Sequence, residues 1–391
     1  MKIGYIHINR DEQSKVMQVL NLLTEPTALD ELGIGRIRDA FSNKMFPGTS
    51  TLQKHAKYFS LMPQLYLRAT QKKYNRISEV KAEVIRLEKI MTAALCKGSP
   101  DATGITGKDM IKSSDYVKYD PAYIYNSGLF TFEILNEGSL YELIYSASKH
   151  LHESPERLKN EDEDKGDDAN ELGNYFQFCS CPSGIEYDFT TTCNLTLTPA
   201  DIRFIKEHIL KAKATQDTLL KYLIEHEDFP LEKFEKFEDL DETLLPTDLK
   251  ELLHKAQTFA NFIYLAHLRY NWIFSKGTDE DMKAEFIDCY TKYRANIPNI
   301  DYIVSGLEIR EKSGISFCKN IVKCLNADDN FKSLDQLIIK REKDVKGSRN
   351  KLGSKQVYDK EHRIHHYRLN YRWDTVKTIV KEIRGMEVTN G

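Results

Sequence analysis

Apolar residues recur every three or four positions along much of this chain, which is the period of an amphipathic helix. The clearest example begins at Ile77 and ends at Leu95, where six apolar residues mark one helix face. The same period predicts further helices over 9–23, 30–41, 50–62, 247–274, 279–294, 316–325 and 373–383.

Start and stop signals support several of these helices. Ser50 and Gln53 have the spacing of a capping box, in which the side chain of each residue accepts a hydrogen bond from the backbone N–H of the other. Another helix is predicted to begin after Thr198, a helix-capping residue, with Asp201 in its first turn. Gly385 is expected to end the last helix, because glycine readily adopts the left-handed backbone of a helix C-terminus.

The pattern changes between positions 175 and 197. Residues 175–180 and 187–197 are rich in Thr, Phe, Tyr and Cys, and the turn residues Pro182, Ser183 and Gly184 lie between them. This arrangement favours a β-hairpin. We therefore expect a mainly α, multi-lobed helical protein with a small β-hairpin or sheet element near 175–197.

The length of 391 residues exceeds what one ordinary core accommodates, so several lobes are expected. Residues 153–173 are acidic, polar and without periodicity, which predicts a flexible segment. The predicted division is an N-terminal helical lobe (1–152), this acidic segment, a β-hairpin with a central helical lobe (174–330), and a basic C-terminal segment with a final helix (331–391).

Composition points to a soluble protein of a reducing compartment. The apolar fraction is 41% and the charged fraction 29%, as in ordinary folded proteins. Seven cysteines, an odd number in a long chain, do not resemble a secreted disulfide framework. No apolar run of signal-peptide length opens the sequence, and Asn261, His267 and Arg269 interrupt the most apolar helix. A cytoplasmic location is expected.

Charge is distributed unevenly along the sequence. The net charge is -3, yet Lys340 to Trp373 contains eleven Lys or Arg against four Asp or Glu. That stretch therefore carries +7, and the remainder of the chain carries -10. A local basic field attracts polyanions whatever the total charge is.

The basic stretch is the strongest functional signal in the sequence. Lys and Arg release counterions from nucleic-acid phosphates, and planar rings and guanidinium groups can stack on exposed bases. The alternative is that this stretch docks against the acidic segments of its own chain. The predicted nucleic-acid-binding residues, with DNA expected ahead of RNA, are Lys340, Arg341, Lys343, Lys346, Arg349, Lys351, Lys355, His365, His366 and Arg368.

Signals for catalysis or metal binding are weak. Cys179, Cys181 and Cys193 supply soft ligands but lack the paired spacing of structural zinc sites, and alternation along a buried strand would place Cys179 and Cys181 on one face in any case. Acidic pairs followed by Arg310 or Arg363 resemble nuclease motifs only loosely. We predict no metal site and no cofactor, and we assign no catalytic residue.

Six segments, in order along the chain, carry a resemblance to a known family: Asp30–Phe41, Phe46–Thr51, Arg269-Tyr270-Asn271, Arg341-Glu342, Lys346-Gly347 and Tyr371-Arg372-Trp373. Together they resemble a bacterial family known as the domain of unknown function numbered 6361. The resemblance implies a cytosolic component of an anti-phage defence system, with the Azaca type as one candidate, encoded beside helicases and phospholipase-D-like nucleases. The acidic stretch 161–168 resembles an insertion, and Lys108 stands where the family pattern has Arg.

These observations lead to one functional expectation and two alternatives. The expectation is a non-catalytic component of a bacterial anti-phage defence complex that binds nucleic acid and docks on a helicase or phospholipase-D-like nuclease, away from any membrane. One alternative is a catalytic effector, a nuclease, of the same kind of system. The other is a scaffold without nucleic-acid contact, whose basic stretch meets an acidic partner surface.

Overall fold

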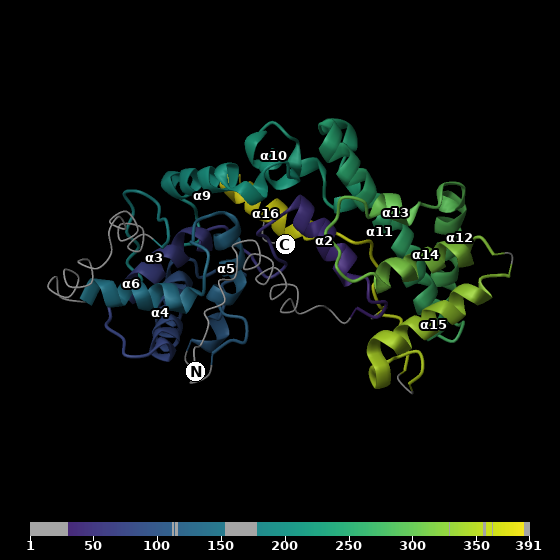
Figure 1. Cartoon of the computed structure of the whole chain (residues 1–391), viewed down its shortest axis with the longest axis horizontal. Coiled ribbons are helices and arrows are strands. Elements are labelled where there is room, and N and C mark those ends of the chain that lie inside the picture. The colour runs from purple at the N-terminus through teal and green to yellow at the C-terminus, as the bar shows by residue number, and fades with distance from the viewer. Residues whose placement is uncertain are drawn as a thin grey trace, which may run out of the picture. The chain divides into compact units, whose positions relative to one another are not determined.

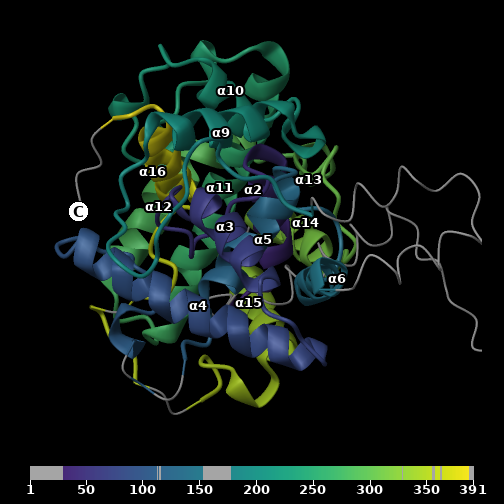
Figure 2. The same cartoon turned by 90° about the vertical axis from the view of Figure 1, so that its left-hand side faces the viewer.

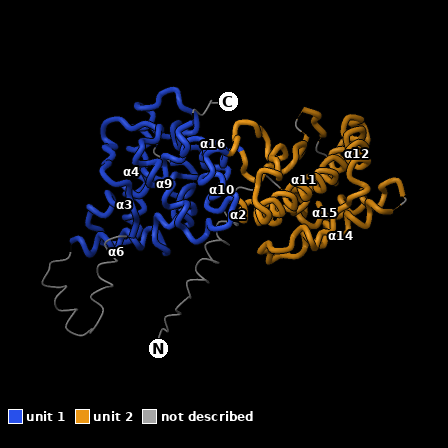
Figure 3. The backbone as a smooth tube through the Cα atoms, turned by 90° about the horizontal axis from the view of Figure 1, so that it is seen from above, with its two compact units in different colours: residues 1–21, 46–228, 374–391 blue, residues 22–45, 229–373 orange. Residues whose placement is uncertain are grey.

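The computed structural model describes residues 30–111, 113, 116–152, 178–327, 329–354, 357–361 and 363–386. This part of the chain is helical and contains no β-strand, only one isolated bridge between Leu135 and Cys179. Its internal contacts divide the chain into two compact units, drawn in different colours in Figure 3. Of the described residues, those within 46–228 and 374–386 form unit 1, and those within 30–45 and 229–373 form unit 2.

Unit 1 is organised around α3 (Tyr58–Thr70), whose sequence is apolar on most sides. A helix of this kind must be buried, and α3 packs on four others. Figure 2 faces this unit, with α4 crossing the near side. The surrounding helices are α4 (Ile77–Gly98), α5 (Pro121–Thr131), α6 (Leu140–His152) and α9 (Pro199–Lys211), with α10 (Leu219–Glu225) against α9 and the 3-10 turns η1 (Lys108–Met110) and η2 (Lys213–Thr215) between helices.

Unit 2 is built on α11 (Thr247–Phe274), which packs on α12 (Glu280–Tyr293), α13 (Ile300–Ile303) and α15 (Lys332–Lys346). Next to α15 lies α14 (Ser313–Leu325), which also contacts α2 (Gly35–Met45) (Figure 1). The 3-10 turns of unit 2 are η3 (Leu231–Lys233), η4 (Phe237–Asp239), η5 (Glu242–Leu244), η6 (Arg294–Asn296) and η7 (Gly347–Arg349). Helix α16 (Trp373–Ile383) belongs to unit 1 from its second residue.

Most of the predicted helices are confirmed. Helices α4, α11, α12, α14 and α16 begin and end within three residues of the predicted bounds. The Thr198 hydroxyl accepts a hydrogen bond from the Asp201 N–H, and the Thr198 N–H donates to the Asp201 carboxylate, so a capping box starts α9 after Thr198 as predicted. Gly385 adopts a φ of 68° after α16. The predicted helix over 9–23 lies outside the described residues. Within the described part, no helix has the length and apolar character that crossing a membrane requires.

The helix predicted over 50–62 begins later than expected. The Ser50 N–H does donate to the Gln53 side-chain oxygen at 3.1 Å. However, the side-chain NH₂ group of Gln53 donates to the carbonyl groups of Gly48 and Ile124. The Gln53 side chain therefore fixes a turn rather than the first turn of a helix. The helix itself, α3, begins at Tyr58.

The predicted β-hairpin near 175–197 is wrong for the described residues 178–197. The Phe178–Ser180 segment pairs instead with the segment before α6: the Asn136 N–H donates to the Phe178 carbonyl, and the Ser180 N–H to the Ile134 carbonyl, each at 2.8 Å. After the expected turn, the Gln64 side chain of α3 donates to the Ile185 carbonyl and accepts from the Tyr187 N–H. Further along, the Cys193 N–H donates to the Ala94 carbonyl of α4. A side chain and a distant backbone segment thus replace the expected strand pairing.

A buried ion pair joins the starts of α3 and α9. Lys57 precedes α3 and its ammonium lies 2.7 Å from the Asp201 carboxylate; the two side chains are 1% and 0% exposed. The same ammonium bonds to the Tyr187 hydroxyl and the Thr196 carbonyl. Burial alone would raise the pKa of Asp201, but the hydrogen bonds from Lys57 and Tyr187 lower it below its usual value.

We predict that Lys57→Met destabilises the protein by about 3–5 kcal/mol, because the Asp201 carboxylate would remain buried without a counter-charge. Urea denaturation monitored by circular dichroism measures the loss. Lys211→Met, at the exposed pair with Glu207 on α9, is the matched control and should change stability little. Equal midpoints for the two variants would contradict a stabilising role for this pair.

Candidate nucleic-acid interface

The basic stretch follows unit 2 from the second half of α15 through η7 to the start of α16. Lys355, one of the predicted binding residues, lies outside the described part of the chain. The other nine separate into two groups. One group points into the unit and contacts acids, carbonyl groups or rings; the other is exposed on the surface of α15 and η7.

Arg341 belongs to the inward group. Its guanidinium donates to the carbonyl groups of Leu32 and Gly33, at 2.8 and 3.1 Å, and lies 5.1 Å from the centre of the Phe317 ring. Gly33 has a φ of 64°, and a Cβ there would lie 2.7 Å from the Arg341 guanidinium. Glycine is therefore required at position 33, and Arg341 ties α15 to the segment before α2.

Lys351 and His365 share a single buried carboxylate, that of Glu31. The Lys351 ammonium lies 2.9 Å from one oxygen, and the His365 Nε2 lies 2.7 Å from the other. Glu31 is 2% exposed. Burial alone would raise its pKa, but the hydrogen bonds from His365 and Lys351 outweigh that effect and bring the pKa to about 2. Lys351 therefore neutralises an internal acid, and His365 forms a hydrogen bond with it.

His366 and Arg368 also contact acids of unit 2. The His366 Nε2 lies 3.0 Å from the Glu285 carboxylate. Arg368 pairs with Glu238 at 3.0 Å and donates to the Asn261 side chain at 2.7 Å. These two residues lie against the surface of α11 and α12 and retain partial exposure.

Arg363, another cation of the stretch, binds the start of α12. It donates two hydrogen bonds to Asp279, at 2.8 and 2.7 Å, and a third to Asp281. Burial alone would raise the pKa of Asp279, but the bonds from Arg363 and Tyr358 lower it to about 2. Asp279 is also the N-cap of α12, so this pair links the basic stretch to the beginning of a helix.

The C-terminal part of α11 supplies three of the anchors for the basic stretch and for α15. Arg269 forms two hydrogen bonds with Asp335, and Tyr270 donates to the buried carboxylate of Glu342 at 2.6 Å. Asn271 both accepts from the N–H and donates to the carbonyl of Ile364. The three consecutive residues of the Arg269-Tyr270-Asn271 block therefore fix α15 and the following loop to the core helix.

His267 lies one turn before this block and stacks on His365, with ring centres 4.9 Å apart. It is almost completely buried, and its Nδ1 has no hydrogen-bond partner among the described residues. Burial and, to a lesser extent, the neighbouring His365 together lower the pKa of His267 to about 3, although the Glu31 carboxylate opposes them. The ring is therefore neutral near pH 7 and acts as a packing surface for His365.

Tyr371, Arg372 and Trp373 end the stretch in the core. Tyr371 and Arg372 both adopt left-handed backbone conformations, with φ of 47° and 68°. Such residues cost on the order of 1–3 kcal/mol each and need compensating contacts. The Tyr371 hydroxyl donates to the Ala256 carbonyl, and Arg372 donates to the Asn43 side chain, each at 2.8 Å. Trp373 is fully buried.

The outward group consists of Lys340, Lys343, Lys346 and Arg349. Lys340, Lys343 and Arg349 are exposed and Lys346 is half-buried. The three lysines are spaced by three residues on α15, which places them on neighbouring turns of one helix surface. None of the four has an ion pair with a residue that the structure describes. We call these four residues the α15 basic face; the exposed Asp344 lies beside it.

Lys346 belongs to this face and also lies close to the Glu31 carboxylate, to which Lys351 and His365 bind. Burial lowers the pKa of Lys346, the carboxylates of Glu31 and Asp30 oppose that effect, and Lys351 and Arg349 add to it. Lys351 and Arg349 therefore lie close enough to Lys346 to repel its charge, while the carboxylates of Glu31 and Asp30 attract it.

Other groups singled out in the sequence lie apart or are already paired. Asp301 pairs with Lys319, and the Glu361 N–H donates to the Asp359 carboxylate. Among the described residues, no three His, Cys, Asp or Glu side chains gather in a way that could hold a metal ion.

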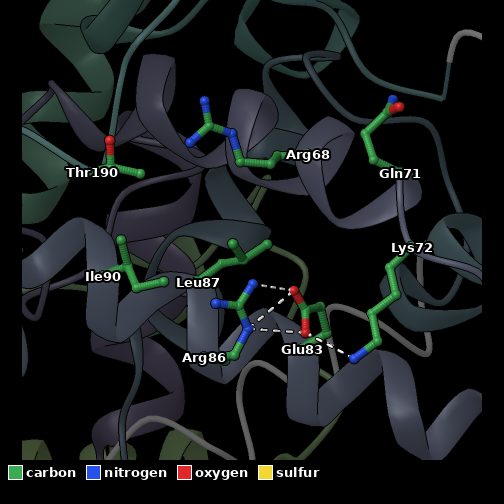
Figure 4. A pocket seen from close by; sticks show the side chains of 8 residues that line it. All are labelled: Arg68, Gln71, Lys72, Glu83, Arg86, Leu87, Ile90 and Thr190. Atoms are coloured by element: carbon green, nitrogen blue, oxygen red, sulfur yellow. Dashed lines mark hydrogen bonds and ion pairs between the residues drawn. The ribbon is translucent and has the colours of Figure 1, made fainter.

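A surface pocket of about 390 Å³ lies between α3 and α4 in unit 1. Two of its cations, Lys72 and Arg86, approach the Glu83 carboxylate from opposite sides (Figure 4). Its positive charge is therefore partly neutralised within the pocket. The lining residues are Arg68, Gln71, Lys72, Glu83, Arg86, Leu87, Ile90 and Thr190.

The contacts of Glu31 generate a prediction about pH. Because the folded-state pKa is about 2 and the ordinary value is 4.5, the stabilisation is complete above pH 4.5 and disappears as the pH falls toward 2. A shift of this size corresponds to about 3 kcal/mol of unfolding free energy. Urea denaturation at pH values from about 2.5 to about 7 measures this effect. The Glu31→Gln variant should lose less stability on acidification than the wild type. Parallel curves would contradict the proposed role of this carboxylate.

One family model matches the chain, that of the family of unknown function DUF6361, and it covers residues 1–287. The matched residues include the Asp30–Phe41, Phe46–Thr51 and Arg269-Tyr270-Asn271 segments and end before the basic stretch. Neither the curated proteins nor the solved structures contain a significant match. Because the match covers well over half of its residues, the chain belongs to the family of unknown function DUF6361.

Proposed function

We propose that the protein binds nucleic acid, with DNA ahead of RNA, through the α15 basic face. In this proposal it is a non-catalytic component of a bacterial anti-phage defence complex and docks on a helicase or phospholipase-D-like nuclease. The observation that carries the proposal is the separation of the basic stretch into cations that neutralise internal acids and cations that face solvent.

The charges of Lys340, Lys343 and Arg349 are available to a ligand because these residues are exposed and form no ion pair with a described carboxylate. Lys346 is half-buried, and the carboxylates of Glu31 and Asp30 attract its charge. By contrast, Lys351, Arg363 and Arg368 each pair with an acid of unit 2. Moving the inward residues to a phosphate would leave buried carboxylates such as Glu31 without a counter-charge, which is energetically costly. The proposed contact surface is therefore limited to Lys340, Lys343, Lys346 and Arg349.

Phosphate contacts of this kind are sequence-independent and depend on salt. Each cation that neutralises a phosphate releases counterions, so the logarithm of the binding constant falls linearly with the logarithm of the salt concentration. The exposed lysines and Arg349 can follow a phosphate backbone along the helix surface, but the four described side chains offer no base-reading contact that would specify a sequence. We expect binding to duplex DNA with little sequence preference.

Replacing Lys340, Lys343 and Arg349 together by Gln should weaken DNA binding and make it less sensitive to salt. Loss of three phosphate contacts should reduce the slope of log K against log salt by about 2 to 3. Fluorescence anisotropy with a labelled DNA duplex, single-stranded DNA and single-stranded RNA, across a salt series, measures both quantities and ranks the three polymers.

A triple Gln variant at Lys283, Lys292 and Lys323 is the matched control. These exposed lysines belong to α12 and α14 of the same unit, and their removal changes the net charge by the same amount. The control should retain the wild-type slope. Absence of wild-type binding at low salt, or equal losses in the two triple variants, would refute the proposal.

Asp344→Asn should have the opposite effect. Asp344 follows Lys343 and lies one helical turn after Lys340, so its negative charge opposes a phosphate on the α15 basic face. The substitution should strengthen DNA binding at low salt, and the gain should shrink as salt screens the interaction. The same anisotropy series measures this. Unchanged or weaker binding at low salt would place the contact surface elsewhere.

A further inference from the structure

Two of the free cysteines, Cys179 and Cys181, lie two residues apart in an extended segment of unit 1. Backbone hydrogen bonds on both sides of Cys179, from the Asn136 N–H and to the Ile134 carbonyl, hold this segment against its partner. Pro182 follows and favours an extended backbone at Cys181. Side chains two residues apart in an extended segment point to the same side. The two thiols therefore face the same way.

The two sulfurs differ in access. Cys179 is 4% exposed, and its thiol contacts the Pro63 carbonyl of α3. Cys181 is half-buried and lines a surface pocket of about 490 Å³. The pocket is formed by α3 and its end together with the segment after Cys181. Its other lining residues are Gln64, Leu67, Arg68, Gln71, Ile185, Glu186, Tyr187 and Phe189. A small reagent can therefore reach Cys181, while Cys179 lies behind it.

The pair also differs in acidity. The neighbouring Cys179 thiol lowers the pKa of Cys181, although burial opposes the effect. The proximity of Cys181 raises the pKa of Cys179, and burial adds to that rise. The accessible sulfur is thus the better thiolate, and a thiolate is the form that attacks a disulfide.

We propose that Cys179 and Cys181 form a redox-active dithiol, in which Cys181 attacks a low-molecular-weight disulfide and Cys179 resolves the product. The Cys181 thiolate forms a bond to one sulfur of the small disulfide and expels the other sulfur as a thiolate. Cys179 then loses its proton to solvent, attacks the Cys181 sulfur and expels the second small thiolate. The protein loses two electrons and two protons, and the small disulfide is reduced to two thiols.

The spacing of the two cysteines makes the resulting disulfide easy to reduce. In an extended segment, Cα atoms two residues apart are separated by about 6.6 Å. That separation is near the upper limit of about 6.8 Å for disulfides, so closing the bond requires the backbone around Ser180 to bend. Strained disulfides are the labile ones. The proposed reaction is therefore reversible, and it is independent of the α15 basic face in unit 2.

The test is oxidation of the full-length, reduced protein by glutathione disulfide, followed by alkylation of the remaining thiols and peptide mass mapping. The wild type should lose two hydrogens in the peptide that contains both cysteines, and dithiothreitol should restore them. Cys179→Ser should instead accumulate a stable mixed disulfide between glutathione and Cys181. Cys181→Ser should leave Cys179 as a thiol.

Cys324→Ser is the matched control, because Cys324 is also half-buried but has no cysteine two residues away. It should behave as the wild type does. The wild type alone supplies a second readout, since Cys181 lines an open pocket and should react with iodoacetamide at pH 7 faster than the buried Cys179. Unchanged thiols after glutathione disulfide treatment, or the same stable mixed disulfide in the wild type and in Cys179→Ser, would overturn the proposal.

Discussion

The need to satisfy buried carboxylates, with a counter-charge or with hydrogen bonds, determines the arrangement of unit 2. Glu31 receives Lys351 and His365, and Glu342 receives the Tyr270 hydroxyl and two backbone N–H groups, those of Lys351 and Leu352. A buried carboxylate without such partners would cost several kcal/mol. The need to satisfy these two acids therefore fixes where the chain runs after α15, and it places the following loop against α11.

The same requirement divides the cations of the basic stretch into two groups, those that pair with internal acids and those that face solvent. Lys351 pairs with Glu31, so it cannot bind a phosphate without leaving the buried Glu31 carboxylate without its lysine counter-charge. Lys340 and Lys343, on the outer surface of α15, have no such commitment among the described residues. A charge count over the sequence treats all these residues alike, because it contains no information about which cation faces inward. The net balance of +7 consequently overstates the charge available to a ligand.

How much of the structure could be predicted depended on the range of the interactions involved. The bounds of α4 and α11 followed from local periodicity, and the start of α9 from the side chains of Thr198 and Asp201. The segment after 177 was misjudged, because the partner of Phe178–Ser180 is the distant segment 134–136. β-Propensity indicates that a segment is extended, but it does not identify the partner.

The candidate site shows the same limit. The sequence located the basic stretch, whereas Glu31, Glu285 and Asp279 were missed as its partners, since they are distant in sequence. The Arg269-Tyr270-Asn271 block was noticed through family resemblance, and the structure gives it a physical meaning as the anchor of α15 and the loop after it. A polar block within an apolar helix is a signal that could have suggested buried partners.

Lysine acylation with a water-soluble ester, read by mass spectrometry with and without duplex DNA, tests the division of the basic stretch most directly. The account predicts that Lys340 and Lys343 react quickly in the free protein and are protected by DNA. It predicts that Lys351, paired with Glu31, reacts slowly in both states. Fast reaction of Lys351 in the free protein, or DNA protection of Lys351 but not of Lys340 and Lys343, would contradict it.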